Sequence, residues 1–205
     1  MNARKQPAKE DLQPLWQMLN SFQPVGKGIE QHLVKSIYCC TIPKGKYLLR
    51  SGEVCHNLYF IRKGLLRGFI KEGNKEITTW FAMENEIVAG IRSFLLQVET
   101  VENIQAVEES ELLAINFSDL NKIYEKYPSF NITGRRITEF HYILAENRAY
   151  ITRLHDAEKK YALFQEFYPQ LANRVQLTYV ASFLGITNET LSRVRAKTSA
   201  RKRAT

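Results

Sequence analysis

The sequence has few of the residues from which a metal or redox centre is built. It contains three cysteines and four histidines. The cysteines lack C-x-x-C spacing and are too few for a four-cysteine iron–sulphur cluster, and no two histidines stand two residues apart, as the His-x-His sites of cupin enzymes require. A G-x-S-x-G nucleophile motif is also missing. These absences favour a binding protein over an enzyme, with no metal or other cofactor expected.

Long apolar runs are equally scarce. No segment approaches the roughly 18 apolar residues that a membrane span requires. No apolar leader precedes Cys39, Cys40 and Cys55. We therefore expect reduced thiols and a cytoplasmic protein without a membrane partner.

Positive charge is in excess and is unevenly placed. Lys and Arg number 29 against 21 Asp and Glu, which gives a net charge of +8 and an isoelectric point near 9.4. Between Asp156 and Thr205, nine basic residues stand against four acidic ones. This concentration favours a polyanionic partner near the C-terminal end of the chain.

The stretch from Gln176 to Arg195 predicts a helix-turn-helix. Apolar residues at helical spacing predict two short helices with a shared core, at Val180, Ala181, Leu184, Leu191 and Val194. Gly185 suits a left-handed turn between the helices, and Thr187 suits the cap of the second one. Polar side chains remain near the start of the second helix, which a helix-turn-helix places in the DNA major groove: Asn188, Glu189, Ser192 and Arg193. The alternative is an ordinary helical hairpin with a solvated face.

The first two thirds of the chain predict short helices followed by a β-roll. Residues 1–10 are polar and are expected to be disordered, and helices are predicted over about 12–22 and 28–36. From residue 37 onward, short β-branched and aromatic runs alternate with glycine-containing turns. Many short strands at this spacing indicate a barrel or roll. A short helix over 119–127 should end before Pro128.

A long helix is predicted from about Asn131 to His155, with another from Ala157 to Tyr168. A heptad seam runs along the long helix: Ile137, Phe140, Leu144, Asn147, Ile151 and Leu154. Because one buried Asn fixes register and pairing in two-stranded coils, we predict a parallel homodimer. The alternative is that the stripe packs on the chain's own roll, since Tyr142, Ile143 and Tyr150 widen the apolar face.

The order of roll, long helix and helix-turn-helix resembles the cAMP receptor protein/Fnr (Crp/Fnr) family of bacterial transcription regulators. IPKGKYLLRSGE and LYFIRKGLLRG are similar to the first hairpins of the family's cyclic-nucleotide-binding roll. AEKKYALFQEFYP and VASFLGITNETLSRVR are similar to its DNA-binding end, particularly in members from Bacteroidetes-type bacteria. The resemblance implies an α+β fold: a cyclic-nucleotide-binding-like β-roll (double-stranded β-helix) over 1–127, a long dimerisation helix over 128–156, and a helix-turn-helix over 157–205.

The resemblance also implies roles for individual residues in DNA binding. Thr187 would begin the recognition helix, Glu189 would accept from cytosine, and Arg193 would bridge guanine. Asn188 stands where the best-known members have arginine, so the recognised sequence should differ. The full set of DNA-binding candidates is Gln176, Thr178, Thr187, Asn188, Glu189, Ser192, Arg193, Arg195 and Lys197.

The family's phosphate-binding cassette is eroded in this sequence. Asn85-Glu86 stands for its Gly-Glu pair and Thr100-Val101 for its Arg-Ser or Arg-Thr pair, while Glu99 and Glu102 add negative charge. A phosphate would meet carboxylates and no forked cation, so cAMP is not expected to bind in the usual way. The candidate residues for an unidentified effector are Glu86, Arg92, Thr100, Val101 and Tyr142.

A second departure from the family lies at the end of the sequence. AKTSARKRAT shows no strand-like alternation, so we predict that the family's two-stranded wing is absent and that a flexible basic tail contacts phosphates instead. The predicted function is a homodimeric, sequence-specific transcription regulator whose partners are double-stranded DNA, a second copy of the chain, and RNA polymerase. The alternative is a dimeric ligand-binding roll that acts on protein partners.

Overall fold

The computed structural model describes residues 5–171 and 174–203, with the backbone alone for residues 199–203. Contacts divide the chain into two compact units. One contains residues up to 70 together with 81–141, and the other contains residues 71–80 together with 142 onward.

The first unit begins with two amphipathic helices, α1 (Lys9–Phe22) and α2 (Lys27–Ser36). Leu12, Leu15 and Leu19 lie on the buried face of α1. The expectation of disorder over residues 1–10 is wrong where the chain is described, because Lys5 forms a β-bridge with Cys39 and α1 already begins at Lys9. The Asp11 carboxylate accepts from the Ala8 N–H at 2.8 Å, which fixes the start of the helix.

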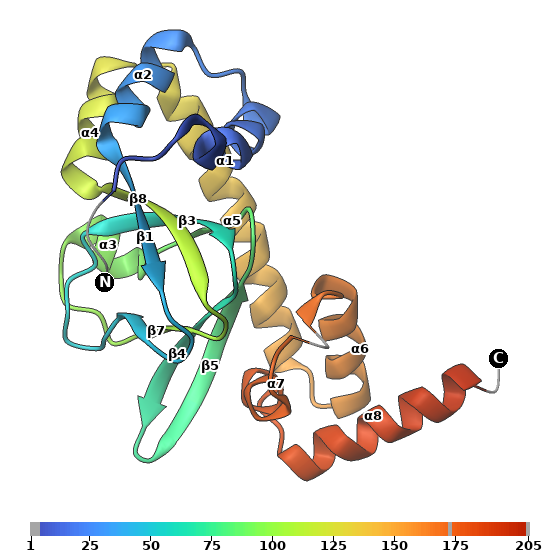
Figure 1. The fold of residues 1–205 in the computed structure, drawn as a ribbon. Helices are drawn as coiled ribbons and strands as arrows, with labels where there is room; N and C mark the ends of the chain where they lie inside the picture. Colours follow the sequence, from blue (N-terminus) through green and yellow to red (C-terminus); the bar gives the residue numbers. More distant parts are fainter. Residues whose placement is uncertain (1–4, 172–173, 204–205) are drawn as a thin grey trace. The chain divides into compact units, whose positions relative to one another are not determined.

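Eight strands form two four-stranded sheets. The first sheet has the order β1-β8-β3-β6 and the second has the order β2-β7-β4-β5. The strands are β1 (Ile37–Ile42), β2 (Tyr47–Leu49), β3 (Asn57–Lys63), β4 (Leu66–Glu72), β5 (Lys75–Ala82), β6 (Ile87–Val88), β7 (Asn103–Ala106) and β8 (Ser110–Asn116). This arrangement is the predicted β-roll, and Figure 1 shows α1, α2 and α4 gathered at one end of it.

The core of the roll is formed by aliphatic and aromatic residues of both sheets. The largest fully buried apolar side chains are Ile61, Leu65, Leu66, Phe69, Ile104, Leu112 and Leu113. Gly64, between β3 and β4, is required for a close approach: its φ is +107°, and a Cβ atom there would lie 2.7 Å from the Glu109 carbonyl oxygen. This glycine-containing turn therefore also allows the chain to pass the start of β8.

Helices α3 and α4 belong to the first unit, and α5 begins in it. Helix α3 (Ile91–Leu96) lies between β6 and β7, and α4 (Phe117–Lys126) follows β8. The Asn116 side chain caps α4 by accepting from the Ser118 N–H at 2.9 Å. Helix α5 (Phe130–Arg153) then begins after Pro128. No helix in the described ranges is long and apolar enough to cross a membrane.

The second unit consists of the tip of the β4–β5 hairpin, the end of α5 from Tyr142 onward, and a helical group: α6 (Ala157–Phe167), α7 (Leu177–Leu184) and α8 (Asn188–Arg203). Its core contains Phe164, Leu171, Leu184 and Leu191, each fully buried. The Phe164 ring lies 5.7 Å from that of Phe183, centroid to centroid, and so ties α6 to α7.

The prediction of a flexible basic tail is wrong for the described residues, because α8 continues as a helix to Arg203. Alanine, lysine and arginine are strong helix formers, which favours continuation of the helix. The Thr198 hydroxyl donates to the Val194 carbonyl one turn earlier, at 2.9 Å. The described residues after α7 contain no strand. The absence of the wing stays a prediction.

Candidate nucleic-acid interface

The turn between α7 and α8 is fixed by its backbone. Gly185 has φ +63° and ψ +41°, in the left-handed region that glycine enters without a steric cost. The Ile186 N–H bonds the Ala181 carbonyl at 3.1 Å, and the Thr187 hydroxyl accepts from the Thr190 N–H at 3.2 Å. The structure thus places Gly185 at the end of α7 and Thr187 at the cap of α8.

The two faces of α8 differ in burial. Leu191 is 0% exposed and Val194 is 7% exposed, so this face packs inward. The opposite face is exposed and carries Asn188, Glu189, Ser192 and Arg193. Gln176 and Thr178, at the start of α7, are also exposed, whereas Arg195 is half-buried. The side chains that were predicted to contact bases therefore lie together on one accessible surface.

Glu189 and Arg193 combine an acceptor and a forked donor one helical turn apart. Hydrogen bonding to its own backbone N–H at the helix start lowers the pKa of the Glu189 carboxyl, and the Thr187 hydroxyl and the Arg193 charge lower it further. Arg193 Nη2 donates to Thr190 Oγ1 at 3.3 Å. A carboxylate can accept from cytosine N4 and a guanidinium can donate to guanine O6 and N7.

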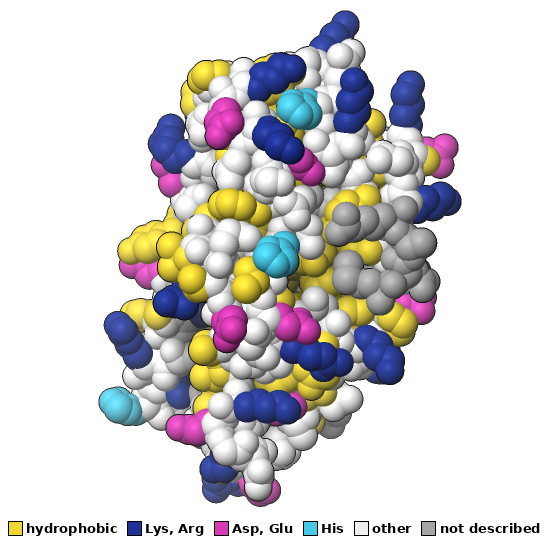
Figure 2. Space-filling view, turned by 90° about the vertical axis from the view of Figure 1, so that its left-hand side faces the viewer, with side chains coloured by type: hydrophobic (Ala, Val, Ile, Leu, Met, Phe, Trp, Pro, Cys, Tyr) yellow, Lys and Arg dark blue, Asp and Glu magenta, His cyan; other side chains and the backbone are white. Residues whose placement is uncertain are grey.

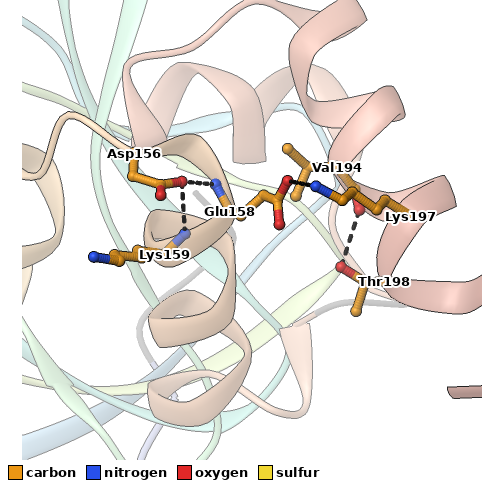
Figure 3. Close-up of polar contacts among 6 residues, drawn as sticks. All are labelled: Asp156, Glu158, Lys159, Val194, Lys197 and Thr198. Atoms are coloured by element: carbon orange, nitrogen blue, oxygen red, sulfur yellow. Dashed lines mark hydrogen bonds and ion pairs between the residues drawn. The ribbon is translucent and has the colours of Figure 1, made fainter. Parts of the chain in front are cut away.

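Lys197 has a partner within the chain (Figure 3). Its ammonium forms an ion pair with the Glu158 carboxylate in the first turn of α6. Asp156 caps that turn by accepting from the Glu158 and Lys159 N–H groups at 2.8 and 3.3 Å. Because the Lys197 and Glu158 side chains stay 54% and 39% exposed, the pair contributes at most about 1 kcal/mol. Little free energy therefore opposes the exchange of this carboxylate for another anion.

Two contacts were not found by sequence reasoning. The buried Lys160 ammonium on α6 donates to the Leu184 carbonyl at the end of α7, at 2.7 Å. The Ser182 hydroxyl on α7 donates to the Glu76 carbonyl at 2.7 Å and accepts from the Thr78 N–H at 2.9 Å. Helical spacing could have identified Lys160, since it lies three residues after Ala157 and four before Phe164 on the packed stripe. The Ser182 contact has no sequence signal, because it joins residues 104 and 106 positions apart.

Ser182 completes the edge of a sheet. β5 is the last strand of its sheet, so within the described part of the chain no further strand pairs with its outer edge. A parallel neighbour would bond the carbonyl of one residue and the N–H of the residue two positions later. The single Ser182 hydroxyl supplies both bonds, to Glu76 and Thr78, and so attaches α7 to the hairpin tip within the second unit.

The residues of the eroded cassette do not form a phosphate site in the described structure. Thr100 is 8% exposed, and its hydroxyl accepts from the Glu102 N–H at 3.0 Å within its own segment. Val101 is 75% exposed, and Arg92 is exposed on α3. The Glu86 carboxylate accepts from the Met83 N–H at 3.3 Å, so it is used within its own turn.

Gly90 lies against Leu49, Thr100 and Cys55. A Cβ atom on Gly90 would lie 2.7 Å from Leu49 Cδ2, 3.6 Å from Thr100 Oγ1 and 3.7 Å from Cys55 Cβ, so this position has no room for a side chain. Burial also raises the pKa of the Cys55 thiol, which favours its neutral form. Tyr142, the fifth effector candidate, belongs to the second unit and is 70% exposed on α5.

The surface of α3 is unusually apolar for an exposed helix. Ile91, Leu95 and Leu96 are each about 60% exposed, at 59%, 60% and 60%. Figure 2, which faces this side of the molecule, shows hydrophobic side chains among charged ones. A separate apolar cavity of about 60 Å³ lies under α1, α2 and α4, lined by Leu19, Leu33, Leu113 and others. It is smaller than the roughly 150 Å³ that accommodates benzene, so a nucleotide does not fit.

The seam predicted along α5 needs a correction. Ile151 is 0% exposed within its own chain, and Leu144 and Ile137 are half-buried. The large apolar side chains exposed on α5 include Phe140 at 45%, Ile143 at 54% and Tyr150 at 63%. Adjacent residues at these positions are both apolar in the sequence, and burial within the chain shows which of them stays exposed. The exposed seam therefore lies one residue earlier at two of its positions: Phe140, Ile143, Asn147, Tyr150 and Leu154.

Residues 40–127 match the family model of the cyclic nucleotide-binding domain, so the roll belongs to that class of domain. The chain is also 24% identical over 165 residues to the transcriptional regulatory protein btr of Bordetella pertussis, a match that spans 75% of this chain and 67% of btr.

Solved structures share the fold at low sequence identity. FixK2 from Bradyrhizobium japonicum superposes with a TM-score of 0.72 at 14% identity, over 81% of this chain and 86% of FixK2. A CooA variant from Carboxydothermus hydrogenoformans gives 0.66 at 19% identity, over 91% and 84% of the two chains. The regulator CLP of Xanthomonas campestris gives 0.66 at 16% identity, over 86% and 93%. Together with the btr match, these findings agree with the predicted resemblance to the Crp/Fnr family: the chain shares the fold of these regulators and is similar in sequence to a curated transcriptional regulator.

Proposed function

We propose that the protein is a homodimeric, sequence-specific DNA-binding regulator of transcription. The observation that carries the proposal is the pair Glu189 and Arg193, both exposed one turn apart at the start of α8. The helix that presents them is anchored by Leu191 and Val194 in a packed core. An acceptor and a forked donor held on a rigid helix are the chemistry that distinguishes base pairs in the major groove.

The surrounding residues supply the sequence-independent part of binding. The exposed Gln176 and Thr178 at the start of α7 would contact phosphates, since the first helix of a helix-turn-helix crosses the backbone. Lys197 would exchange Glu158 for a phosphate. The local excess of basic residues after Asp156 adds a term that weakens with salt as counterions return to the DNA.

The dimer would form along the exposed seam of α5. Phe140, Ile143 and Tyr150 offer apolar surface to a second copy, and the half-buried Asn147 lies between them. The intervals along Phe140, Ile143, Asn147, Tyr150 and Leu154 are three, four, three and four residues, which is a heptad seam. A twofold pair of this kind can set two recognition helices about 34 Å apart, on successive major grooves.

The roll would act as a sensor whose effector is not cAMP held in the usual way. Thr100 is buried and bonded locally, Val101 faces outward, and Glu86 is bonded in its turn, so the cassette offers a cyclic phosphate no cation. The structural relative CLP is described as c-di-GMP-responsive, which supports the idea that a roll of this type can serve another ligand. RNA polymerase would be the partner on promoter DNA.

Selection of bound fragments from random duplexes tests the proposal. We expect a palindromic site with half-sites about 10 base pairs apart. On that site, Arg193→Ala should reduce discrimination at one base pair by about 1–3 kcal/mol. Lys197→Ala should weaken all duplexes alike and reduce the salt slope by about 1. A chain that binds no duplex at low salt would contradict the proposal and favour action on protein partners.

A further inference from the structure

Lys160 is a basic side chain buried beneath the helix-turn-helix. It is 7% exposed, and among the described residues only Arg67 is a second buried basic side chain. Removing an ammonium group from water is unfavourable unless a partner compensates for it. The neighbouring Lys159 is exposed, so a lysine on this part of α6 can reach solvent, and the burial of Lys160 is specific to its position.

The partner of Lys160 is the carbonyl that ends α7. Nζ donates to the Leu184 oxygen at 2.7 Å. The last carbonyls of a helix lack N–H partners in that helix, and they form the negative end of its dipole. The Lys160 ammonium both donates a hydrogen bond to this carbonyl and places a positive charge at the negative end of the helix. Gly185 follows directly, and a Cβ atom there would lie 3.7 Å from the same ammonium.

We infer that Lys160 is a positioning residue for base recognition, which sets the angle at which α8 leaves the turn. This inference rests on the proposed function. Between the pinned Leu184 carbonyl and the first residue of α8 lie only Gly185, Ile186 and Thr187. A shift of that carbonyl would therefore change the direction of the α8 axis, because three residues are too few to compensate for it.

Geometry converts a small tilt into a lost contact. Arg193 lies five residues beyond Asn188, about 8 Å along the helix at 1.5 Å per residue. A tilt of about 10° at the turn would then move the backbone at Arg193 by roughly 1.3 Å, which exceeds the tolerance of about 0.5 Å for a positioned site. Contacts with phosphates made by long, exposed side chains tolerate such a shift, because they do not require a fixed bidentate geometry.

The test compares the ratio of affinities for the selected site and for a random duplex. Lys160→Met keeps the length of the side chain and removes the charge and the donor. We expect this ratio to fall at least about tenfold, the effect of losing one good base contact. The salt slope and the random-duplex affinity should stay within about twofold of wild type, because a buried ammonium neutralises no phosphate.

Two matched variants separate positioning from other effects. Lys159→Met removes the same charge from the exposed neighbour and should leave the ratio unchanged. Lys160→Arg keeps a cationic donor and should recover most of the ratio. Circular dichroism establishes that each variant is folded at the assay temperature. If Lys160→Met is unfolded there, Gly185→Ala replaces it, since this substitution strains the same turn at φ +63°.

The outcomes are distinct. A folded Lys160→Met protein, or a folded Gly185→Ala protein in its place, that keeps the wild-type ratio overturns the inference. A uniform loss of affinity for both duplexes in Lys160→Met also overturns it, because that would show a role in the charge or stability of the unit as a whole. A wild-type chain that itself shows no preference for any duplex contradicts the proposed function instead.

Discussion

Replacing Ile143 by aspartate should separate the proposed dimer. Phe140, Ile143 and Tyr150 keep roughly half of their surface exposed, at 45%, 54% and 63%. A large side chain offers about 150–250 Å² in total, so each leaves on the order of 80–100 Å² for a partner, worth about 2 kcal/mol. Six such side chains in a dimer give about 12 kcal/mol, comparable with the 4–15 kcal/mol that association costs.

The margin is small, so one substitution per subunit should be decisive. Ile143→Asp removes about 4 kcal/mol of apolar burial from the dimer and places two carboxylates at the seam. At 1.4 kcal/mol per factor of ten, the dimer dissociation constant should rise by about 10³ or more. Affinity for a palindromic site should fall in parallel, since the two recognition helices are then no longer linked.

Sedimentation velocity over a range of protein concentrations measures the effect. Ala145→Asp is the matched control, because this exposed residue lies two positions later and points away from the seam by about 200°. It should remain dimeric. An Ile143→Asp protein that stays folded and dimeric at the concentrations where the control is dimeric would refute the assignment of the seam.

Three further predictions follow from single contacts. Asp156→Ala removes the cap of α6, with bonds of 2.8 and 3.3 Å, and should reduce the free energy of unfolding by about 0.5–2 kcal/mol in a denaturant titration. Burial raises the pKa of Cys40 from 9.0 to about 11, so this thiol stabilises the fold below pH 9, and that contribution is lost as the pH rises toward 11. Its reaction with a thiol reagent at pH 8 should be much slower in folded protein than in urea-unfolded protein, and equal rates would contradict the burial. Ser182→Ala should speed hydrogen exchange of the Thr78 amide by about tenfold, because one hydrogen bond is lost. Ser182→Thr keeps the hydroxyl and should retain the protection. An unchanged exchange rate in the alanine variant would contradict the contact between Ser182 and Thr78.

Much of the architecture could be predicted because it is encoded locally. The period of apolar residues, together with Gly185 and Thr187, is enough to place α7, the turn and α8. The strands of the roll are similarly marked by short β-branched runs between glycine-containing turns. The order before α1 was missed because the bridge from Lys5 to Cys39 is a tertiary contact, whereas the Asp11 cap at Ala8 is local and could have been read from the sequence.

The parts that could not be predicted depend on which of two similar residues the folded chain covers. Leu144 and Ile143 are equally apolar, and only packing within the chain shows that Ile143 is the one left exposed at 54%. The roles of Lys160 and Ser182 likewise depend on distant partners, at Leu184 and on β5. Sequence patterns locate helices well, but they do not show which buried polar group meets which carbonyl.

The attachment of Ser182 to β5 also bears on how the protein behaves when it is partly opened. An edge strand with free N–H and C=O groups is a template on which another chain can add a strand. While α7 is in place, the Glu76 carbonyl and the Thr78 N–H are occupied. If α7 separated from β5, these two backbone groups would become accessible to another chain, so we expect the Ser182 contact to limit strand addition at this edge.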